Sequence, residues 1–331
     1  MEVNEFIQRY TSGENDFSGV MLAGVDLVGA DLIGIILQDS NLSRANFTFA
    51  YLSRANLSRA NLMESNFSGA NLNQASLDGA NLHRSEFHGA ILQKADMRSV
   101  QMSLANLLDA NLMEVDFRSA DLSNANLKGA CLRGSNMRQE KRGKPTNLKG
   151  ANLDKADLKN VDLQGADLTR ASLVGANLAD VNLRNANLTG ADLTGANLKG
   201  ASLTDIKLEG AKLIGANLSN VKMERGNLTD ADLTMANLES ATMPDAKLVR
   251  TNLIQANLNF ARLNRVDLSR ANLYGAIMRN ASLMDVFFAR TNLTSADLSD
   301  SNLIGADLSS ANITGVNFNG SIMPDGQVYH K

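Results

Sequence analysis

Residues 187–203 read NLTGADLTGANLKGASL, a five-residue word repeated with small changes. An α-helix repeats about every 3.6 residues and a β-strand about every two, so neither element explains this period. We call the large apolar residue of each word its centre. Centres recur every five residues from Phe17 to Met137 and again from Leu148 to Met323, which gives 25 and 36 repeats. The period of five therefore defines the structural unit of the chain.

The five positions of the word differ in chemistry. Of the 61 centres, 46 are Leu, 7 Phe, 7 Met and 1 Ile, and the small site two residues earlier is Ala in 38 words. The residue just before the centre is Asn in 27 words and Asp in 14, and the residue two after it is Gly in 21. Charged residues avoid the centre and the small site. Because unpaired charges are rarely buried, the centre and the small site face a core and the other three positions face water.

The frequent glycines predict regularly spaced turns with positive φ or close backbone approach. Short extended links between such turns produce a coil that keeps bending the same way, whereas Gly and Asn at this density would destabilise helices. The pattern therefore predicts an all-β solenoid. Two trios spaced by 20 residues predict four repeats per coil, with their members stacked: Phe47, Phe67 and Phe87, and Arg250, Arg270 and Arg290.

The word A-(D/N)-L-x-x resembles that of the pentapeptide-repeat proteins over residues 15–323. The resemblance implies that family's fold, a right-handed quadrilateral parallel β-helix, here of about 15 coils. It places Leu193 and Ala191 inside, and Asp192, Thr194 and Gly195 outside. Both termini, RYTSGENDFSG at residues 9–19 and SIMPDG at 321–326, resemble those of a cyanobacterial group of regulators within the family.

The sequence outside the repeats predicts two caps and one interruption. Val3, Phe6, Ile7 and Tyr10 share one face of a helix expected at residues 2–12, inside a cap of residues 1–14. A helix that docks a partner is the alternative. The repeats then occupy 15–137 and 148–323, separated by 138–147, and the tail 324–331 is expected to fold over the last coil because Pro324 ends the strand.

The interruption contains RQEKRGKPT, residues 138–146, and we call residues 138–147 the basic loop. Met137 and Leu148 are 11 residues apart, so a protruding loop or bulge must absorb the change of register. Its candidate functional residues are Arg138, Lys141, Arg142 and Lys144. Loops on rigid scaffolds often carry function, but insertions are also tolerated at little cost, so both interpretations stay open.

Nothing in the sequence predicts catalysis, a cofactor or a metal site. Cys131 is the single cysteine, and His83 and His88 are expected to be solvated surface residues. The many Asp and Ser residues are spread over a convex surface, whereas an active site needs groups that converge in a pocket. No apolar stretch long enough to cross a membrane and no signal peptide are present, so a cytoplasmic protein without membrane association is expected.

Two surfaces in the C-terminal third are candidates for binding. The candidate partner or dimer surface consists of Ile214, Ile254, Phe260, Tyr274, Ile277, Met284 and Phe287. The candidate basic surface consists of Arg225, Arg250, Arg262, Arg265, Arg270 and Arg290. A smaller apolar candidate near the N-terminus consists of Met21, Ile36, Phe49 and Tyr51. Scattered apolar residues need no explanation, but a contiguous patch usually marks an interface.

The leading hypothesis is a non-catalytic regulatory module that binds a protein partner of unknown identity or a second copy of itself. The family resemblance adds an alternative, mimicry of DNA against a type II topoisomerase. A net charge of −3 and the excess of Asn over Asp argue against such a mimic, which would need a strongly negative surface. A second alternative is phosphate or nucleic-acid binding through the arginines, although the chain as a whole is not basic.

Overall fold

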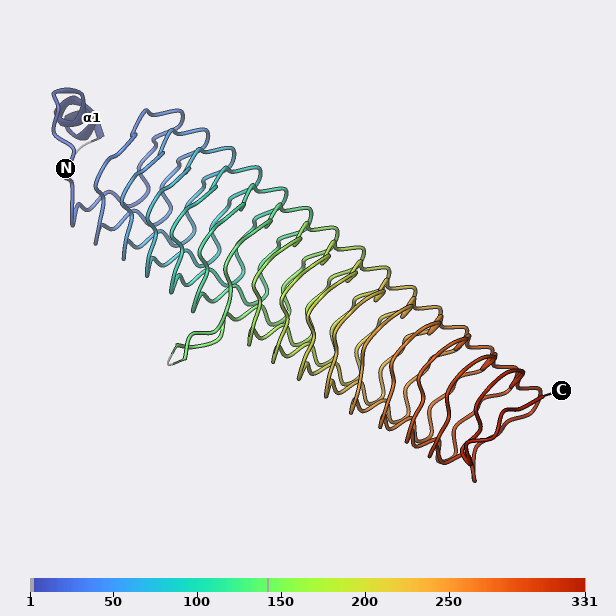
Figure 1. The fold of residues 1–331 in the computed structure, drawn as a ribbon. Helices are drawn as coiled ribbons and strands as arrows, with labels where there is room; N and C mark the ends of the chain where they lie inside the picture. Colours follow the sequence, from blue (N-terminus) through green and yellow to red (C-terminus); the bar gives the residue numbers. More distant parts are fainter. Residues whose placement is uncertain (1–2, 142, 331) are drawn as a thin grey trace. The chain divides into compact units, whose positions relative to one another are not determined.

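In the computed structural model of the protein, residues 3–141 and 143–330 are described (Figure 1). The chain divides into two compact units, Met1–Asp167 (unit 1) and Leu168–Lys331 (unit 2). Helix α1 (Val3–Thr11) is the one helix among the described residues, and their β-structure consists of isolated bridges. No helix in this part of the chain is long and apolar enough to cross a membrane. Each unit is a stack of four-sided coils.

Parallel bridges connect residues 20 positions apart and set the register of each stack. In unit 1 Asp16 pairs with Ile36 and Met21 with Asn41, and in unit 2 Asp192 pairs with Lys212. Twenty residues hold four words, so one word forms one side of a coil. The predicted β-solenoid is thereby confirmed.

Backbone hydrogen bonds hold each five-residue word to the next coil and form its turn. The N–H of centre Leu22 donates to the carbonyl of Asn41 in the next coil (2.9 Å), and that of Gly24 donates to Ser43 (2.8 Å). Within the turn, the N–H of Val25 donates to the carbonyl of Leu22 (3.2 Å). Buried backbone groups require such partners, and here the neighbouring coil supplies most of them.

The residue two after each centre forms a corner of the coil, and we call its position the corner site. Its φ is positive at most corners, as the third residue of a type II turn requires. Glycine was predicted here for this reason, and Gly195 has φ 66°. Many corners nevertheless carry larger residues, such as Asp39 (φ 58°) and Arg59 (φ 56°). These residues adopt a backbone conformation that L-residues usually avoid.

The Asn or Asp before the centre holds the following turn in place. The Oδ1 atom of Asn41 accepts the backbone N–H of Ser43 (3.2 Å) and its hydroxyl (2.9 Å). The same oxygen accepts the Nδ2–H of Asn61 one coil later (3.2 Å). Either Asn or Asp can hold the turn, but only Asn can also donate to the preceding coil. This difference gives Asn a structural advantage in stacked columns.

The core follows the predicted burial pattern. Every centre from Phe17 to Leu303 is buried, and Ala191 and Leu193 are fully buried, whereas Thr194 is half-buried and Gly195 exposed. The rings of Phe47, Phe67 and Phe87 stack in successive coils, with centroids 4.8 Å apart. The trio therefore occupies one column of the core, as its spacing predicts.

Most buried hydroxyl groups at the small site are paired with the backbone, and that of Ser301 is an exception. Ser40 donates to the carbonyl of Phe17 (3.1 Å), and Thr251 donates to that of Leu228 (3.0 Å), one coil earlier in each case. At these two positions the bonds let a polar residue replace Ala without leaving a buried group unpaired.

At the start of unit 1, helix α1 buries Phe6, whose ring lies 4.7 Å from that of Phe17. The hydroxyl of Tyr10 donates to the carbonyl of Ile33 (3.0 Å). Residues 1 and 2, part of the expected cap, lie outside the described residues. The helix covers the core of the first coil.

At the end of unit 2, the tail folds back, and Val328 forms an antiparallel bridge with Ile322. It covers only part of the last coil, because Phe318 is 7% exposed but Ile313 is 47% exposed. Residue 331 of the expected tail is not among the described residues. The tail therefore folds over the side of the last coil that carries Phe318 and leaves Ile313 exposed.

Candidate functional site

The basic loop leaves the coil at a single corner of unit 1 (green in Figure 1). Bridges across it, Asp121 with Asn147 and Asn136 with Asp162, span 26 residues instead of 20. The next bridge, Asn147 with Asp167, spans 20 again. Six extra residues are therefore extruded, and the coil continues without a lasting change of register.

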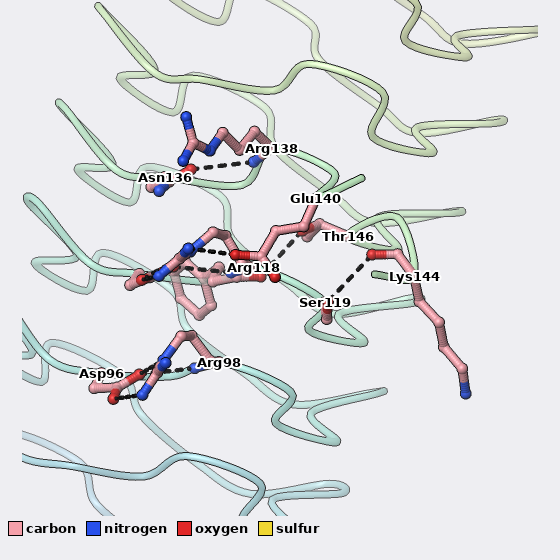
Figure 2. Close-up of polar contacts among 11 residues, drawn as sticks. Asp96, Arg98, Arg118, Ser119, Asn136, Arg138, Glu140, Lys144 and Thr146 are labelled. Carbon is pink, nitrogen blue, oxygen red and sulfur yellow. Dashed lines mark hydrogen bonds and ion pairs between the residues drawn. The ribbon is translucent and has the colours of Figure 1, made fainter. Parts of the chain in front are cut away.

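Contacts with the preceding coil hold the loop against unit 1 (Figure 2). Glu140 forms an ion pair with Arg118, and the hydroxyl of Ser119 donates to the carbonyl of Lys144 (3.3 Å). The buried hydroxyl of Thr146 donates to the carbonyl of Phe117 (3.0 Å). The loop is thus attached at its middle and near its end. These contacts attach the described part of the loop to the preceding coil.

An arginine column leads up to the loop. Arg98, Arg118 and Arg138 each follow a centre, on successive coils of one side of unit 1 (Figure 2). Arg98 donates to both oxygens of Asp96 (2.8 and 2.6 Å), and Arg118 binds Asp116 in the same way. These hydrogen bonds raise the pKa of both guanidinium groups. Sequence analysis missed this column, although its spacing of 20 residues is the signal used for the other trios.

The column ends in an unneutralised cation. Asn136 takes the place that Asp96 occupies beside Arg98, so the residue before the centre gives Arg138 no carboxylate. Lys141 and Lys144 are exposed, and none of these three cations forms an ion pair within the described residues. Arg142, the fourth predicted loop residue, lies outside the described residues. The loop therefore presents positive charge to solvent.

Two open hollows border the loop. One, of about 640 Å³, lies between Lys144–Pro145 and the two preceding coils. Its lining residues are Ser99, Val100, Gln101, Ser119, Ala120, Asp121, Lys144, Pro145 and Asn147. The other, of about 390 Å³, is lined by Arg138, Gln139, Glu140, Lys141 and Gln164. Both are polar recesses that an extended side chain of a partner could enter.

In unit 2, four ladders of bridges define four sides. Side I carries Leu248 and Leu268, side II Leu253 and Leu273, side III Leu258 and Met278, and side IV Leu263 and Leu283. Because the chain runs through the sides in this order, side II adjoins sides I and III and lies opposite side IV.

The candidate partner surface is distributed over all four sides. Ile214, Ile254 and Tyr274 lie in one column of side II, and Ile277 lies on side III next to the same corner. Phe260 occupies the corner between sides III and IV. Met284 belongs to side IV, and Phe287 to side I. The seven residues therefore do not form one patch, because each step of five residues moves a side chain to another side.

Side II and its corner with side III keep an apolar cluster. Tyr274 is 46% exposed, and Ile254 lies one coil before it. Met235, which sequence analysis missed, occupies the corner one coil earlier and is 61% exposed. A Met in a position usually held by Gly or a charged residue was the available signal. Ile214 is separated from Ile254 by Thr234.

Three arginines of the candidate basic surface are neutralised. Each occupies a corner and binds both oxygens of the Asp at the same corner one coil earlier, with distances of 2.6–2.8 Å. The pairs are Arg225–Asp205, Arg250–Asp230 and Arg265–Asp245. The hydrogen bonds from arginine lower the pKa of all three carboxyl groups. This half of the set is an array of ion pairs, so it does not act as free positive charge.

The other three arginines form no ion pair within the described residues. Arg262 lies on side IV, whereas Arg270 and Arg290 follow Arg250 in the corner column between sides I and II. The predicted stacking of this trio is correct. It places two arginines without an ion pair at the corner where side II, the side of Ile254 and Tyr274, begins.

The smaller apolar candidate in unit 1 is also divided. Phe49, 64% exposed, occupies a corner, and Tyr51 begins the next side. Met21 and Ile36 belong to two other ladders. Only Phe49 and Tyr51 are neighbours, and they cover too little surface to define a site.

The residues considered for chemistry do not converge. Among the described residues, no group of three His, Cys, Asp or Glu side chains could hold a metal ion. The Nδ1 atom of His83 lies 2.8 Å from the hydroxyl of Ser103, and Cys131 is half-buried in its bridge ladder. The distinctive surfaces of the described chain are therefore those that a macromolecule could contact.

A β-solenoid that displays such surfaces on stacked five-residue sides is a repeat scaffold. The family model for pentapeptide repeats matches eight times, at residues 40–79, 65–103, 101–139, 146–175, 171–210, 206–248, 246–285 and 288–323. The chain belongs to the pentapeptide repeat family, and the family predicted from the sequence is confirmed.

Several solved structures are similar to this chain. HetL, a pentapeptide repeat protein involved in heterocyst differentiation regulation from the cyanobacterium Nostoc sp. strain PCC 7120, is 27% identical, with 99% of this chain and 100% of that chain covered and a TM-score of 0.20. QnrB1, a plasmid-mediated fluoroquinolone resistance protein, is 19% identical over 63% of this chain and 90% of that chain, with a TM-score of 0.39. A pentapeptide repeat protein from the Arabidopsis thaliana thylakoid lumen is 27% identical over 36% and 68%, with a TM-score of 0.16. No significant match was found among curated proteins.

Proposed function

We propose that this protein is a non-catalytic interaction module in which the basic loop contacts a protein partner. The observation that carries this proposal is the loop's attachment to unit 1 through Arg118–Glu140 and Ser119–Lys144. A segment that is already positioned loses little conformational entropy on binding. The unneutralised Arg138 and the exposed Lys141 and Lys144 supply charge that can attract an acidic partner.

The same proposal includes the finer features of the fold and the location of the protein. The coils are right-handed and quadrilateral, and the 61 repeats make about 15 of them. The protein acts in the cytoplasm, without a cofactor, and binds through the outer surfaces of its units. A packed core of Leu, Ala and Phe leaves no interior space for a substrate.

Mimicry of DNA against a type II topoisomerase is the second candidate function. One observation favours it, a projecting loop with hollows at its base. The charge distribution opposes it, because Asp205, Asp230 and Asp245 are all neutralised by arginine. Binding of phosphate or nucleic acid through Arg270 and Arg290 is the third candidate, and a steep decrease of affinity with salt would identify it.

Excision of the loop tests the proposal. A shortened variant carries Lys-Gly in place of residues 138–145, so that Met137 and Leu148 become neighbouring centres. Glycine is needed because Pro145 would fall on a corner, where proline cannot adopt positive φ. Wild-type protein immobilised in a cyanobacterial lysate is expected to retain a protein that the excised variant does not retain.

Two controls make the result specific. Arg170→Gln removes a cation from a corner of unit 2 and should leave capture unchanged. Thermal unfolding of the excised variant should match the wild type, which shows that the coil remains intact. Equal capture by the wild type and the excised variant would overturn the proposed role of the loop, and capture of a topoisomerase would favour the second candidate.

A further inference from the structure

Side II of unit 2 has an unusual composition in three successive coils. Residues 250–255, 270–275 and 290–295 each begin at the corner before side II and read RTNLIQ, RANLYG and RTNLTS. These segments contain three arginines and no Asp or Glu. In the coil before them, residues 230–235 read DADLTM and carry two carboxylates. Three coils of side II therefore form a continuous surface without negative charge.

The arginine column of this surface is only partly neutralised. Asp230 pairs with Arg250, but the corner neighbour one coil before Arg270 is Arg250, and that before Arg290 is Arg270. Successive coils are about 4.8 Å apart, so two arginines of like charge follow one another in the same corner column. Other corner arginines, such as Arg265, have an aspartate in the equivalent place. Arg270 and Arg290 lack such an aspartate, and carboxylates of a ligand could pair with them instead.

Apolar side chains lie on the same side of the coil as these arginines. Ile254 and Tyr274 stand four residues after Arg250 and Arg270, one coil apart on side II. Met235 extends the apolar surface at the corner with side III, where it is 61% exposed. An exposed aromatic ring next to aliphatic side chains and arginine is the composition found at the centres of protein interfaces.

The polar groups between the two columns are largely used within the protein. Asn292 donates its Nδ2–H to the Oδ1 atom of Asn272 (2.9 Å), which also accepts the N–H of Tyr274 (3.3 Å). The backbone of these coils is hydrogen-bonded to the adjacent coils. A ligand on side II would therefore meet mainly the arginine and apolar side chains, because few free backbone groups remain there.

We propose that side II, through Arg270, Arg290, Ile254 and Tyr274, binds a protein segment that combines acidic and apolar side chains. This inference rests on the proposed function and adds a second surface with a defined partner chemistry. Carboxylates of the segment pair with the two guanidinium groups, and an apolar side chain packs on Ile254 and Tyr274. Arginine suits this role because its planar fork binds a carboxylate through two hydrogen bonds. Nucleic acid fits less well, since binding platforms for single strands use several aromatic rings and side II offers one.

A random-peptide display library tests the proposal with the full-length protein as target. Selected peptides should combine Asp or Glu with an apolar residue. Their affinity should fall by about tenfold or more for Arg270→Gln/Arg290→Gln and for Ile254→Ser/Tyr274→Ser. The first variant removes the groups that pair with carboxylates, and the second removes the apolar contact. Arg265→Gln is the matched control, since it removes a corner arginine of the same unit away from side II, and it should leave affinity unchanged.

Three results would overturn the proposal: no enriched peptide, peptides without acidic residues, or equal losses with Arg265→Gln. Competition by a single-stranded oligonucleotide that abolishes peptide binding would assign the surface to nucleic acid instead. The loop-excised variant should bind the peptides like the wild type. If the side II variants bind peptides like the wild type but excision of the loop abolishes capture of the partner, the proposal for side II is wrong and the proposed function stands. If the side II variants lose the peptides but excision of the loop does not change capture, the role of the loop is wrong and the proposal for side II stands.

Discussion

Arg250 and Asp230 occupy the same corner in successive coils, and two guanidinium nitrogens of the arginine lie 2.6 Å from the two carboxylate oxygens. The residues are 20 positions apart in sequence but become neighbours because four words complete one coil. The same relationship joins Arg59 to Asp39 in unit 1. Corner residues therefore interact along the stack in the same way that residues three or four apart interact on a helix.

These ion pairs predict a defined response to acid. Arginine lowers the pKa of Asp205, Asp230 and Asp245 below the ordinary value of 3.8. A carboxyl group whose pKa is lower in the folded state stabilises the protein above its unfolded pKa and loses this contribution as the pH falls through its folded pKa. The wild type should therefore lose thermal stability as the pH falls below 3.8, and Arg225→Gln/Arg250→Gln/Arg265→Gln should lose less.

Differential scanning calorimetry across this pH range makes the comparison. Arg290→Gln serves as a control because Arg290 forms no ion pair within the described residues, so its pH profile should match that of the wild type. Parallel profiles for the wild type and the triple variant would show that the pairs contribute nothing to stability, which is the outcome for many exposed ion pairs.

The burial pattern predicts a large difference between adjacent words. Leu193→Asp introduces a charge at a fully buried centre and should destabilise unit 2 by roughly 4 kcal/mol or more. Lys199→Asp at an exposed position should change stability by about 0.5 kcal/mol at most. Urea unfolding followed by circular dichroism measures both changes, and similar midpoints for the two variants would refute the burial pattern.

Thr194 is a less suitable control than the sequence suggests. Its hydroxyl donates to the Oδ1 atom of Asp192 (2.6 Å), so Thr194→Asp would lose this bond and place two carboxylates together. The burial pattern alone would predict an almost silent substitution, because it does not include that contact. Lys199 follows a neutral Asn197 and avoids the problem.

Two corner glycines should respond differently to alanine. A Cβ on Gly195 meets nothing within 4 Å, so Gly195→Ala costs only the conformational strain of positive φ, about 1–2 kcal/mol. A Cβ on Gly69 would lie 2.4 Å from the ring of Phe49, so Gly69→Ala should cost more. The free energy of unfolding in urea measures each cost.

The double variant Gly69→Ala/Phe49→Ser separates clash from strain. Without the ring, the added cost of alanine at position 69 should fall to the value found at Gly195. An unchanged cost in the Phe49→Ser background would mean that the ring moves aside freely and that strain alone determines the response.

The sequence predicts the coil well because its period reports burial directly. The centres, the small sites, the glycine corners and the stacked Phe47, Phe67 and Phe87 all follow from counting in fives and twenties. The positive φ of Arg59 or Asp39 does not follow, since the backbone N–H of each corner donates to a carbonyl of the next coil and holds a conformation that these residue types disfavour. Tertiary context overrides local preference at these corners.

The candidate surfaces were harder to predict for a geometric reason. Phe287 and Tyr274 are 13 residues apart in sequence, yet they lie on sides I and II, and Phe260 lies at the corner between sides III and IV. Closeness in sequence is therefore a poor guide to closeness on the surface, whereas multiples of 20 are a good guide. Ion pairs such as Arg225–Asp205 were not predicted from the sequence, because their geometry depends on the corner conformation.

The affinity of the captured partner for the wild type and for the loop-excised variant tests the account most directly. Isothermal titration calorimetry should show that replacing residues 138–145 by Lys-Gly weakens binding by about tenfold or more, while both proteins unfold at the same temperature. Equal affinities for two equally stable proteins would contradict the account, because the anchored basic loop would then have no part in recognising the partner.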